Sequence, residues 1–234
     1  MLKNVIIFPV GSHEYHGEFL PPETDTLIAS RIALDLAKKF NKSHIIPALG
    51  YGVSYEHSDF SSTITVNTEP YASFILNLLD SIDANDSLII LLNGHGGNTN
   101  IIGAIESDYN YRHDKSKVFA PQIYNKKVKD VCIDLLGEFD THAGSVESSL
   151  LSYYGNIPIK DLIKEDDLYI KQMHSSLRFF RNAQVSKSGI IKGTNKLIIN
   201  TDYGKAIHKV ILEQLYEEIT NTKKAINKVL NLNE

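Results

Sequence analysis

Two apolar runs, each followed by a glycine, most strongly constrain how this chain can fold. Residues 4–11 (NVIIFPVG) and residues 87–94 (SLIILLNG) are nearly continuous stretches of Val, Ile, Leu and Phe. Strands buried on both faces, as in a parallel sheet, show continuous apolar runs rather than alternation. We therefore expect both segments to be strands of a mainly parallel central sheet. Residues 43–49 (SHIIPAL) and 117–124 (KVFAPQIY) give two further strand signals.

Segments with helical periodicity separate the first strands. Apolar residues recur every three or four positions over 27–40, which predicts a helix capped by Thr24 or Asp25. Thr68 is expected to cap a second helix that carries Pro70 in its first turn.

More helices are expected towards the end of the chain. One should open near Asn98, one should cover 145–154, and an amphipathic helix should include 207–219. Residues 156–196 show no regular pattern. Strands that alternate with helices predict an α/β fold, with helices on both faces of the parallel sheet. The length allows one large domain or two small ones.

The first polar motif, residues 11–25 (GSHEYHGEFLPPETD), follows the first expected strand. Ligands of parallel α/β sheets bind beyond the carboxyl ends of the strands. Glu14 and His16 are two residues apart, so in extended backbone they point the same way, and Asp25 arrives from the next helix. This mixture suits a divalent ion such as Zn²⁺, Mn²⁺ or Fe²⁺. The alternative is two solvated loop residues and a helix cap.

The second motif, residues 91–98 (LLNGHGGN), places His95 among glycines directly after the most apolar strand. Glycines permit a close approach of the backbone to a ligand. The loop lacks the spacing of a dinucleotide fingerprint and the Lys-Ser/Thr of a P-loop. We therefore interpret His95 as a metal ligand rather than as a buried structural histidine or part of a phosphate-binding loop.

The third motif, residues 140–149 (DTHAGSVESS), precedes an expected helix. His142 is a candidate general acid/base, because the ordinary pKa of histidine lies near neutrality. Glu147 falls in the first turn of that helix, where the helix dipole favours a carboxylate even without a function.

These motifs occur in an order that resembles the creatininase family of metal-dependent amidohydrolases. The matching segments are residues 9–25, 91–98 and 142–149, with a weaker match at 51–66 (YGVSYEHSDFSSTITV). The resemblance implies a three-layer α/β/α sandwich and a homo-oligomer, usually a hexamer. It also implies that a divalent metal, one or two ions of Zn, Mn or Fe, is bound, and that His142 is the family's catalytic or substrate-contacting histidine. The metal ligands carried over are Glu14, His16, Asp25 and His95, with Asp25 bridging two ions and Glu147 at the second acidic position.

The chain also departs from the family pattern. True creatininases carry a Tyr and a metal-binding Glu where this chain has Gly96 and Gly97, close a Trp over the substrate, and have FPGT where residues 60–63 read FSST. The chain has no Trp. These differences argue against creatinine itself as the substrate, and Glu147 is the candidate that replaces the missing carboxylate. The residues expected to contact substrate are Gly96, Gly97, Asn98, His57 and Ser62.

We expect hydrolysis of a C–N bond in a small amide, cyclic amide or formamide by attack of metal-bound hydroxide. Two narrower alternatives are a formamidopyrimidine-nucleotide deformylase of flavin or deazaflavin biosynthesis and a peptidase that trims a cofactor precursor. A phosphorylated substrate would need basic residues, for which Lys187, Lys192 and Lys196 are candidates. A non-catalytic metal-binding subunit and a nucleotide-binding module are alternatives of other classes.

Composition excludes several other kinds of protein. The formal net charge of -4 offers no basic surface for nucleic acid. No apolar stretch approaches the roughly 20 residues that span a bilayer. Cys132 is the single cysteine, so no intrachain disulfide forms and a reducing, cytoplasmic location is expected.

Overall fold

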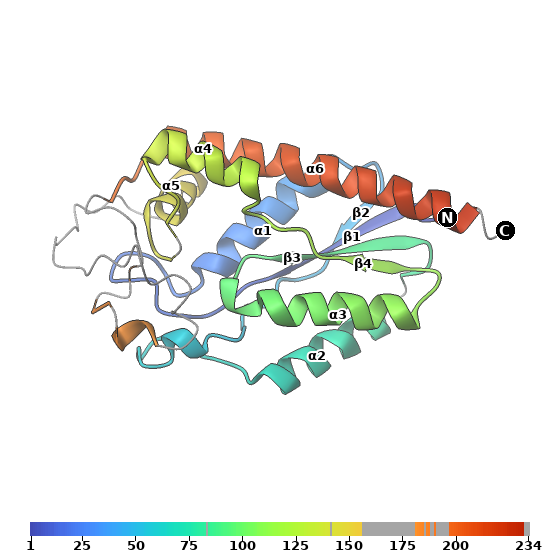
Figure 1. The fold of residues 1–234 in the computed structure, drawn as a ribbon, viewed down its shortest axis with the longest axis horizontal. Helices are drawn as coiled ribbons and strands as arrows, with labels where there is room; N and C mark the ends of the chain where they lie inside the picture. Colours follow the sequence, from blue (N-terminus) through green and yellow to red (C-terminus); the bar gives the residue numbers. More distant parts are fainter. Residues whose placement is uncertain are drawn as a thin grey trace.

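A four-stranded parallel sheet forms the centre of the computed structural model (Figure 1). The structure describes residues 1–82, 84–140, 142–155, 181–184, 186–187, 190 and 197–231. The strands are β1 (Asn4–Val10), β2 (Ser43–Ile45), β3 (Ser87–Asn93) and β4 (Lys117–Phe119), in the order β2-β1-β3-β4. β1 and β3 pair along their whole length, from Asn4 opposite Ser87 to Val10 opposite Asn93. The expected parallel sheet with two central apolar strands is therefore confirmed.

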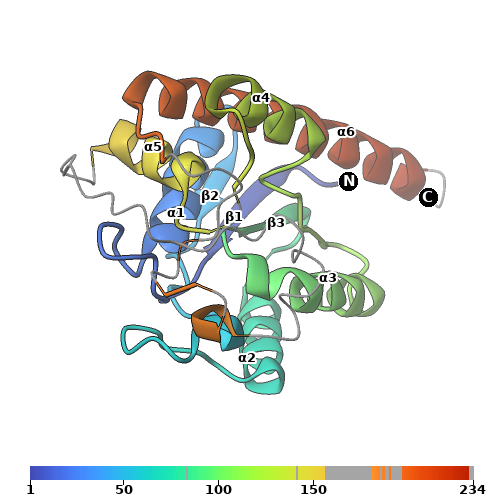
Figure 2. The ribbon, with the colours of Figure 1, turned by 60° about the vertical axis from the view of Figure 1, so that its left-hand side comes forward.

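Alternate residues of these strands enter two separate cores. Val5 and Ile7 pack into one core with α1 (Thr24–Ala37), α4 (Lys126–Leu136), α5 (Ser145–Tyr154) and α6 (Thr201–Asn231). Ile6 and Phe8 pack into the other with α2 (Thr68–Ser81) and α3 (Thr99–Arg112). Figure 2 shows α2 and α3 on one side of the sheet and α4, α5 and α6 on the other. The sheet is thus the middle of three layers, as the resemblance implied.

The helix boundaries differ in detail from those expected. α1 begins at Thr24, but its cap position is Glu23, and the hydroxyl of Thr24 donates to the carbonyl oxygen of Pro21 instead of capping the helix. The predicted caps of the first two helices are wrong: Asp25 lies inside the first turn of α1, and the cap position of α2 is Asn67 rather than Thr68. Asp25 is therefore available for other contacts.

The sequence did not predict α4. Its four-residue spacing of Val128, Cys132 and Leu136 leaves only a narrow apolar stripe between charged residues. The helix begins where Asn125 accepts a hydrogen bond from the amide of Val128, and it ends at Gly137, which has a left-handed φ of 80°. It packs against α6, whose buried side chains recur every fourth residue.

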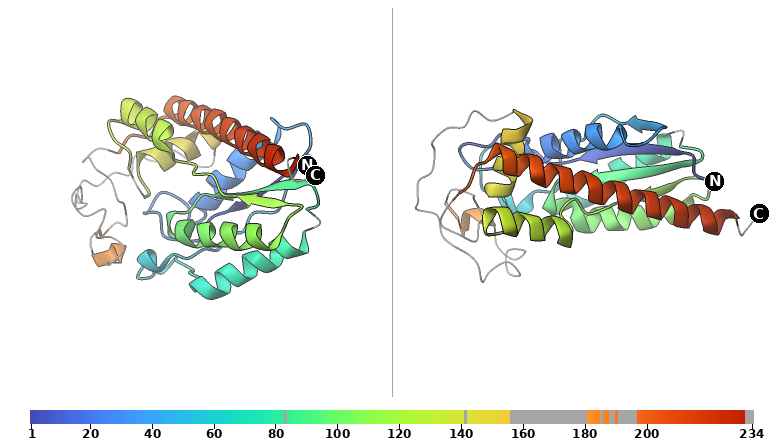
Figure 3. Two further views of the ribbon diagram at one scale, coloured as in Figure 1. Left: turned by 45° about the vertical axis from the view of Figure 1, so that its right-hand side comes forward. Right: turned by 90° about the horizontal axis from the view of Figure 1, so that it is seen from above.

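The two chain termini lie at the amino-terminal end of the strands (Figure 3). The polar motifs follow the strands and so gather at the opposite end. Among the described helices, none combines the length and the apolar run needed to cross a membrane.

α5 and α6 approach each other so closely at Gly204 that only glycine fits there. A Cβ at this position would overlap the backbone carbonyl group of Ser149. We expect Gly204→Ala to lower the free energy of unfolding by about 1–3 kcal/mol, the usual cost of overpacking. Urea denaturation measures this change.

Gly103 in α3 provides the matched control, because a Cβ there meets no heavy atom within 4 Å. Gly103→Ala should stabilise the protein by up to about 1 kcal/mol, since alanine favours helix more than glycine does. Equal unfolding free energies for the two variants would contradict this account of the α5–α6 contact.

Candidate metal centre

Four chain segments meet at the carboxyl end of the sheet. The loop after β1 brings Glu14 and His16, and the first turn of α1 brings Asp25. The loop after β3 brings His95, and the turn before α5 brings His142. All five side chains are buried. The sequence motifs that predicted a common site are therefore adjacent in space.

Asp25 lies between two of the histidines. One carboxylate oxygen, Oδ2, is 2.8 Å from His95 Nδ1 and accepts a hydrogen bond of 2.8 Å from Ser12. The other, Oδ1, is 3.4 Å from His16 Nε2. Glu14 Oε1 lies 3.3 Å from the same His95 nitrogen. This geometry fits the bridging position that the resemblance implied for Asp25.

The protein backbone sets the orientation of each imidazole ring. The far nitrogens of the rings lie 2.8–2.9 Å from backbone carbonyl oxygens: His95 Nε2 from Val53, His16 Nδ1 from Glu14, and His142 Nε2 from Tyr15. A carbonyl oxygen only accepts, so each of these nitrogens is the N–H donor. The opposite nitrogen of each ring then faces the carboxylates, as in metal sites where a backbone group fixes the ligand tautomer.

Two polar atoms at the centre make no hydrogen bond within the described part of the chain, although His16 Nε2 lies in ion-pair range of Asp25. Glu14 Oε2 and His16 Nε2 are buried and have no hydrogen-bond partner among the described residues. Buried polar groups are normally satisfied, so an additional group is expected here. Three sets of side chains each bring three ligand atoms within 4.8 Å of one another: Glu14, Asp25 and His95; His16, His142 and Glu147; and Glu14, His57 and His142. The donor chemistry fits divalent ions.

The pKa values of these groups show how strongly the cluster favours positive charge. Burial raises the pKa of Glu14, but the nearby His95 and His57 outweigh it and bring the pKa to about 2. Burial lowers the pKa of His16, but Asp25 outweighs it and raises the pKa to about 10. In the metal-free protein, protons on the histidines therefore balance the carboxylates, a role that a divalent ion would take over.

Glu147 points back from the first turn of α5 towards His16. Its Oε2 is 3.8 Å from His16 Nε2 and accepts a 2.7 Å hydrogen bond from the amide of Ala143. Burial raises the pKa of Glu147 to about 8, although His16 acts against this. Ala143 has a φ of 53°, an uncommon left-handed conformation outside glycine. The turn thus positions His142 and Glu147 together.

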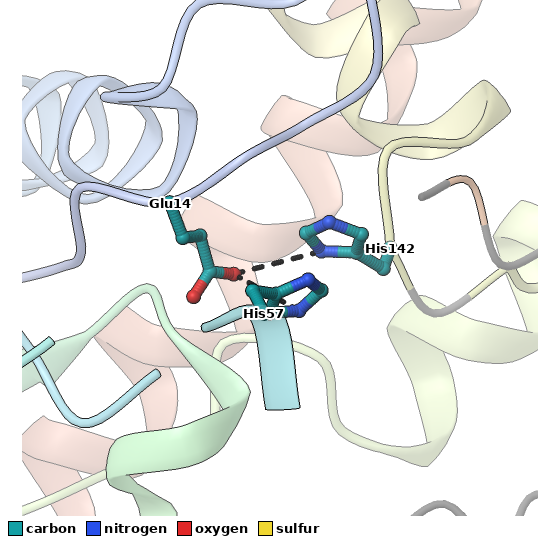
Figure 4. Close-up of side chains that lie close together, drawn as sticks. All are labelled: Glu14, His57 and His142. Atoms are coloured by element: carbon teal, nitrogen blue, oxygen red, sulfur yellow. Dashed lines mark ion pairs between the residues drawn. The ribbon is translucent and has the colours of Figure 1, made fainter. Parts of the chain in front are cut away.

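His142 and His57 face Glu14 from different segments (Figure 4). His142 Nδ1 is 3.6 Å and His57 Nε2 is 3.5 Å from Glu14 Oε1, and the two rings are 3.9 Å apart. Burial lowers the pKa of His142 well below its usual range, and His57 adds to this effect. The pKa of His57 falls to about 4, chiefly through burial. Both rings are therefore neutral near pH 7, and His142 can accept a proton at Nδ1.

The residues expected to contact substrate fall into two groups. Gly96, Gly97 and His57 line a cavity of about 1050 Å³ beside the metal centre. Asn98 and Ser62 do not line it. The amide of Asn98 is fully buried: its oxygen accepts from the backbone amide of Val53, and its nitrogen donates to the carbonyl oxygen of Gly11. Ser62 keeps its hydroxyl buried. Both therefore lie outside the cavity wall.

Three residues at this cavity were missed by the sequence interpretation. Glu56 lies next to His57, with a carboxylate oxygen 2.9 Å from where a Cβ on Gly97 would lie. Asp140, just before His142, accepts hydrogen bonds from the amides at the start of α5, and burial raises its pKa to about 7. Tyr124 ends the segment after β4. In the sequence, Glu56 and Asp140 lie within two residues of His57 and His142, which could have drawn attention to them. Tyr124 lies in an apolar segment that gave no such indication.

Basic residues are few along the described cavity wall. Lys129 and Arg181 line it, and Arg181 pairs with Asp59 at 2.6 Å. Of the lysines considered for a phosphorylated substrate, Lys187 does not line the cavity, and Lys192 and Lys196 lie outside the described residues.

The family model of creatinine amidohydrolases matches residues 2–219. The chain belongs to the creatininase family. It is thus an amidohydrolase of this family, and its buried Glu, Asp and His side chains lie in the motifs that carried the resemblance.

Relatives within the creatininase family differ in the reactions after which they are named. The mycofactocin precursor peptide peptidase of Mycolicibacterium smegmatis is 27% identical over 194 residues, covering 80% of this chain and 73% of that protein. The 2-amino-5-formylamino-6-ribosylaminopyrimidin-4(3H)-one 5'-monophosphate deformylase of Methanosphaera stadtmanae is 32% identical over 108 residues. That match covers 45% of this chain and 46% of the deformylase, so it spans about half of each protein.

Solved creatininases share the fold. A mutant creatininase of the Zn-Zn type has a TM-score of 0.75 at 18% identity, covering 94% of this chain and 90% of the other. A manganese creatininase also has a TM-score of 0.75, at 17% identity, covering 94% of this chain and 91% of the other. At such identities the similarity establishes the three-layer fold alone.

The burial of Asn98 indicates that it holds the loops of the site together. Removing its side chain leaves the Val53 amide and the Gly11 carbonyl oxygen without these partners. We expect Asn98→Ala to lower the free energy of unfolding by at least about 2 kcal/mol, because each buried unsatisfied group costs about 1–3 kcal/mol. Chemical denaturation of the metal-free protein measures this.

Asn100 is the matched control, because it lines the same cavity but is exposed on α3. Asn100→Ala should change stability by no more than about 0.5 kcal/mol. A stable Asn98→Ala variant with altered substrate affinity would instead favour the original interpretation of Asn98 as a substrate contact.

Proposed function

We propose that this creatininase-family chain is a metal-dependent hydrolase that cleaves a C–N bond in a small amide, cyclic amide or formamide. One observation carries the proposal. Three imidazoles, each fixed through an N–H to a backbone carbonyl oxygen, direct their other nitrogen at buried carboxylates. Lone pairs and carboxylates that converge in this way require a cation.

The ligand atoms form two sets with Asp25 in common, and these sets could hold two ions. Glu14 Oε1, Asp25 Oδ2 and His95 Nδ1 would hold one ion. His16 Nε2, the second oxygen of Asp25 and Glu147 would hold the other. Mixed nitrogen and carboxylate ligands suit Zn²⁺, Mn²⁺ and Fe²⁺. The zinc and manganese forms of solved creatininases support the first two. Glu147 would then supply the carboxylate that true creatininases have at the position of Gly97.

When bound, the metal supplies Lewis acidity and lowers the pKa of a coordinated water towards neutrality. The chain itself manages the protons. His142, neutral and held by its Nε2–H on Tyr15, accepts a proton at Nδ1 and returns it to the departing nitrogen. His57 orients the Glu14 carboxylate. At Gly96 there is open space where a side chain would lie, which leaves this part of the cavity wall free for the substrate backbone or ring, whereas Gly97 packs against the backbone carbonyl group of Val53.

The size of the cavity supports a substrate larger than creatinine. About 1050 Å³ is just above the usual range of about 300–1,000 Å³ for small-molecule sites. A peptide-derived substrate and a formamide are the two alternatives that the named relatives support. A metal-binding subunit without turnover is the alternative of another class, and an amide panel separates it from an enzyme. We propose no nucleic-acid or membrane partner.

We also infer that residues 1–234 act as one domain in a cytoplasmic homo-oligomer, of which the hexamer is the form implied by the family resemblance. The lone Cys132 is buried and leaves no surface thiol. Light scattering of the purified protein measures the assembly state.

Metal removal should abolish turnover reversibly. We expect the protein treated with a chelator to lose hydrolysis of an amide panel, namely creatinine, a hydantoin, an N-formyl amine and a dipeptide. Adding Zn²⁺ or Mn²⁺ should restore it, because the ion provides the electrophile that the side chains lack. Release of formate, ammonia or amine measures turnover.

Metal binding should also raise the melting temperature, since ligands that bind only the folded protein stabilise it. A protein that binds metal and is stabilised but hydrolyses no member of a broad panel would favour the non-catalytic alternative. A protein with no metal-dependent stabilisation would contradict the metal centre itself.

Substitutions should separate metal binding from proton transfer. We expect His95→Ala and Glu147→Gln to lower the bound-metal content, because each removes a proposed ligand. His142→Ala should retain metal and lose turnover by about 10²- to 10⁴-fold, the usual contribution of a general acid/base. Elemental analysis and steady-state kinetics measure the two effects.

Asn100→Ala serves as a control that alters the cavity wall without touching a proposed ligand. If His142→Ala loses metal as His95→Ala does, His142 is a ligand rather than the proton carrier. Unchanged metal content in His95→Ala and Glu147→Gln alike would reject the ligand assignment.

A further inference from the structure

One cluster beside the metal centre includes a histidine that neither proposed ion uses. Glu14, His57 and His142 each offer a ligand atom, and these three atoms lie within 4.8 Å of one another. The three side chains are buried, line the cavity and converge in Figure 4. Among the described residues, His57 belongs to no other set of this kind. The cluster therefore calls for an account of its own.

The spacing of the cluster fits a bound ion better than direct hydrogen bonds. His57 Nε2 is 3.5 Å and His142 Nδ1 is 3.6 Å from Glu14 Oε1. Both separations exceed the roughly 2.7–3.2 Å of an N–H···O hydrogen bond. Ligands held about 2.0–2.2 Å from a tetrahedral zinc ion are about 3.3–3.6 Å apart, because each pair spans an edge of the tetrahedron. Both imidazole nitrogens thus already have the separation from Glu14 that two ligands of one zinc ion would have.

The lone pairs of the cluster are available to an ion. His142 Nε2–H donates to the carbonyl oxygen of Tyr15, so Nδ1 presents its lone pair to Glu14. With its proton on Nδ1, His57 presents the Nε2 lone pair to the same carboxylate. The side-chain nitrogen of Asn182 lies 3.1 Å from both His57 nitrogens, and an atom equidistant from the two is in line with neither lone pair.

Glu14 has a second oxygen to offer. Its Oε2 is buried and makes no hydrogen bond within the described part of the chain. A carboxylate has two oxygens and about four lone-pair sites, so one carboxylate can serve two ions. Glu14 can therefore contribute to the ion proposed at Asp25 and His95 and to another ion at His57 and His142.

The ligand chemistry of the cluster differs from that of the two ions proposed above. Each of those ions has one imidazole and two carboxylates, whereas the cluster has two imidazoles and one carboxylate. Imidazole suits zinc, and manganese binds such sites more weakly. Two dications close by would repel a further ion, so the cluster should fill last.

We propose that Glu14, His57 and His142 form a third, weaker zinc site, and that zinc bound there inhibits the protein. The inhibition rests on the hydrolytic function proposed above, in which His142 accepts a proton at Nδ1. A zinc ion on Nδ1 takes the lone pair that the proton needs. Excess zinc thus converts the proton carrier into a metal ligand.

Equilibrium dialysis against increasing Zn²⁺, followed by elemental analysis, tests the site without turnover. The parent protein should bind two Zn²⁺ per chain and then a third at least about 10-fold more weakly, because the bound ions repel it. His57→Ala should bind only two. His113→Ala is the matched control, since His113 also lies beside a carboxylate, 3.4 Å from Asp80, but does not line the cavity. It should bind three like the parent.

Turnover tests the inhibition. Relative to the protein with two equivalents of Zn²⁺, saturating excess Zn²⁺ should lower the kcat of the parent and of His113→Ala by about 10²- to 10⁴-fold, the contribution assigned to the proton carrier. His57→Ala should lose this inhibition, whatever its own rate. Excess Mn²⁺ should not inhibit the manganese-loaded parent. The comparison of the two metals needs no variant, so it tests the proposal even if His57→Ala does not fold.

The outcomes separate the site from its effect. Saturation of the parent at two ions or fewer would overturn the site, as would a third ion that His57→Ala retains. A third ion that leaves turnover unchanged, or equal inhibition by excess Mn²⁺, would overturn the inhibition by zinc. If no protein hydrolyses any amide but His57→Ala still lacks the third ion, the zinc site stands and the hydrolytic function fails.

Discussion

The buried carboxylates at the end of the sheet impose the constraint on which the rest of the site depends. Glu14 and Asp25 are enclosed by protein, and each lies within a few ångströms of a histidine side chain. Carboxylates removed from water are strongly destabilising unless positive charge lies beside them. In the metal-free protein the protonated His16 and His95 supply that charge. A divalent centre would supply it with less dependence on pH.

The loops at the carboxyl end of the sheet hold these side chains in place. Val53, Glu14 and Tyr15 each offer a carbonyl oxygen to one imidazole, so the backbone decides which nitrogen faces inward. Asn98 ties two of these loops together, and the left-handed Ala143 turns His142 and Glu147 into the site. A site fixed in this way loses little energy in reorganisation when ligand and substrate bind.

The fold of the creatininase family can serve different substrates because many residues that line the cavity are not among those proposed to bind the metal. Gly97 packs so closely against the carbonyl oxygen of Val53 and the side chain of Glu56 that the carboxylate of the family pattern has no room there. Glu147 approaches His16 from the opposite helix. Two relatives are named for reactions on a peptide and on a formamide. This difference agrees with a family in which the metal centre is retained and the residues of the cavity wall vary.

Much of this protein could be predicted from the sequence because its strongest signals are local. Continuous apolar runs identified the central strands, and helical spacing identified α5. The proposed ligands Glu14, His16, Asp25 and His95 stood in short motifs directly after those strands. The narrow apolar stripe of α4 escaped notice because its burial comes from packing against α6. The caps of α1 and α2 were wrong because side chains with good capping propensity found other contacts.

The sequence alone therefore determined the parallel α/β fold and the chemical type of the site, since residue periodicity and ligand identity are written along the chain. Only the tertiary structure decided which atoms face one another. Glu147 meets His16, and Asn98 turns away from the cavity. These outcomes depend on contacts between segments far apart in sequence, which backbone packing fixes and residue order does not reveal.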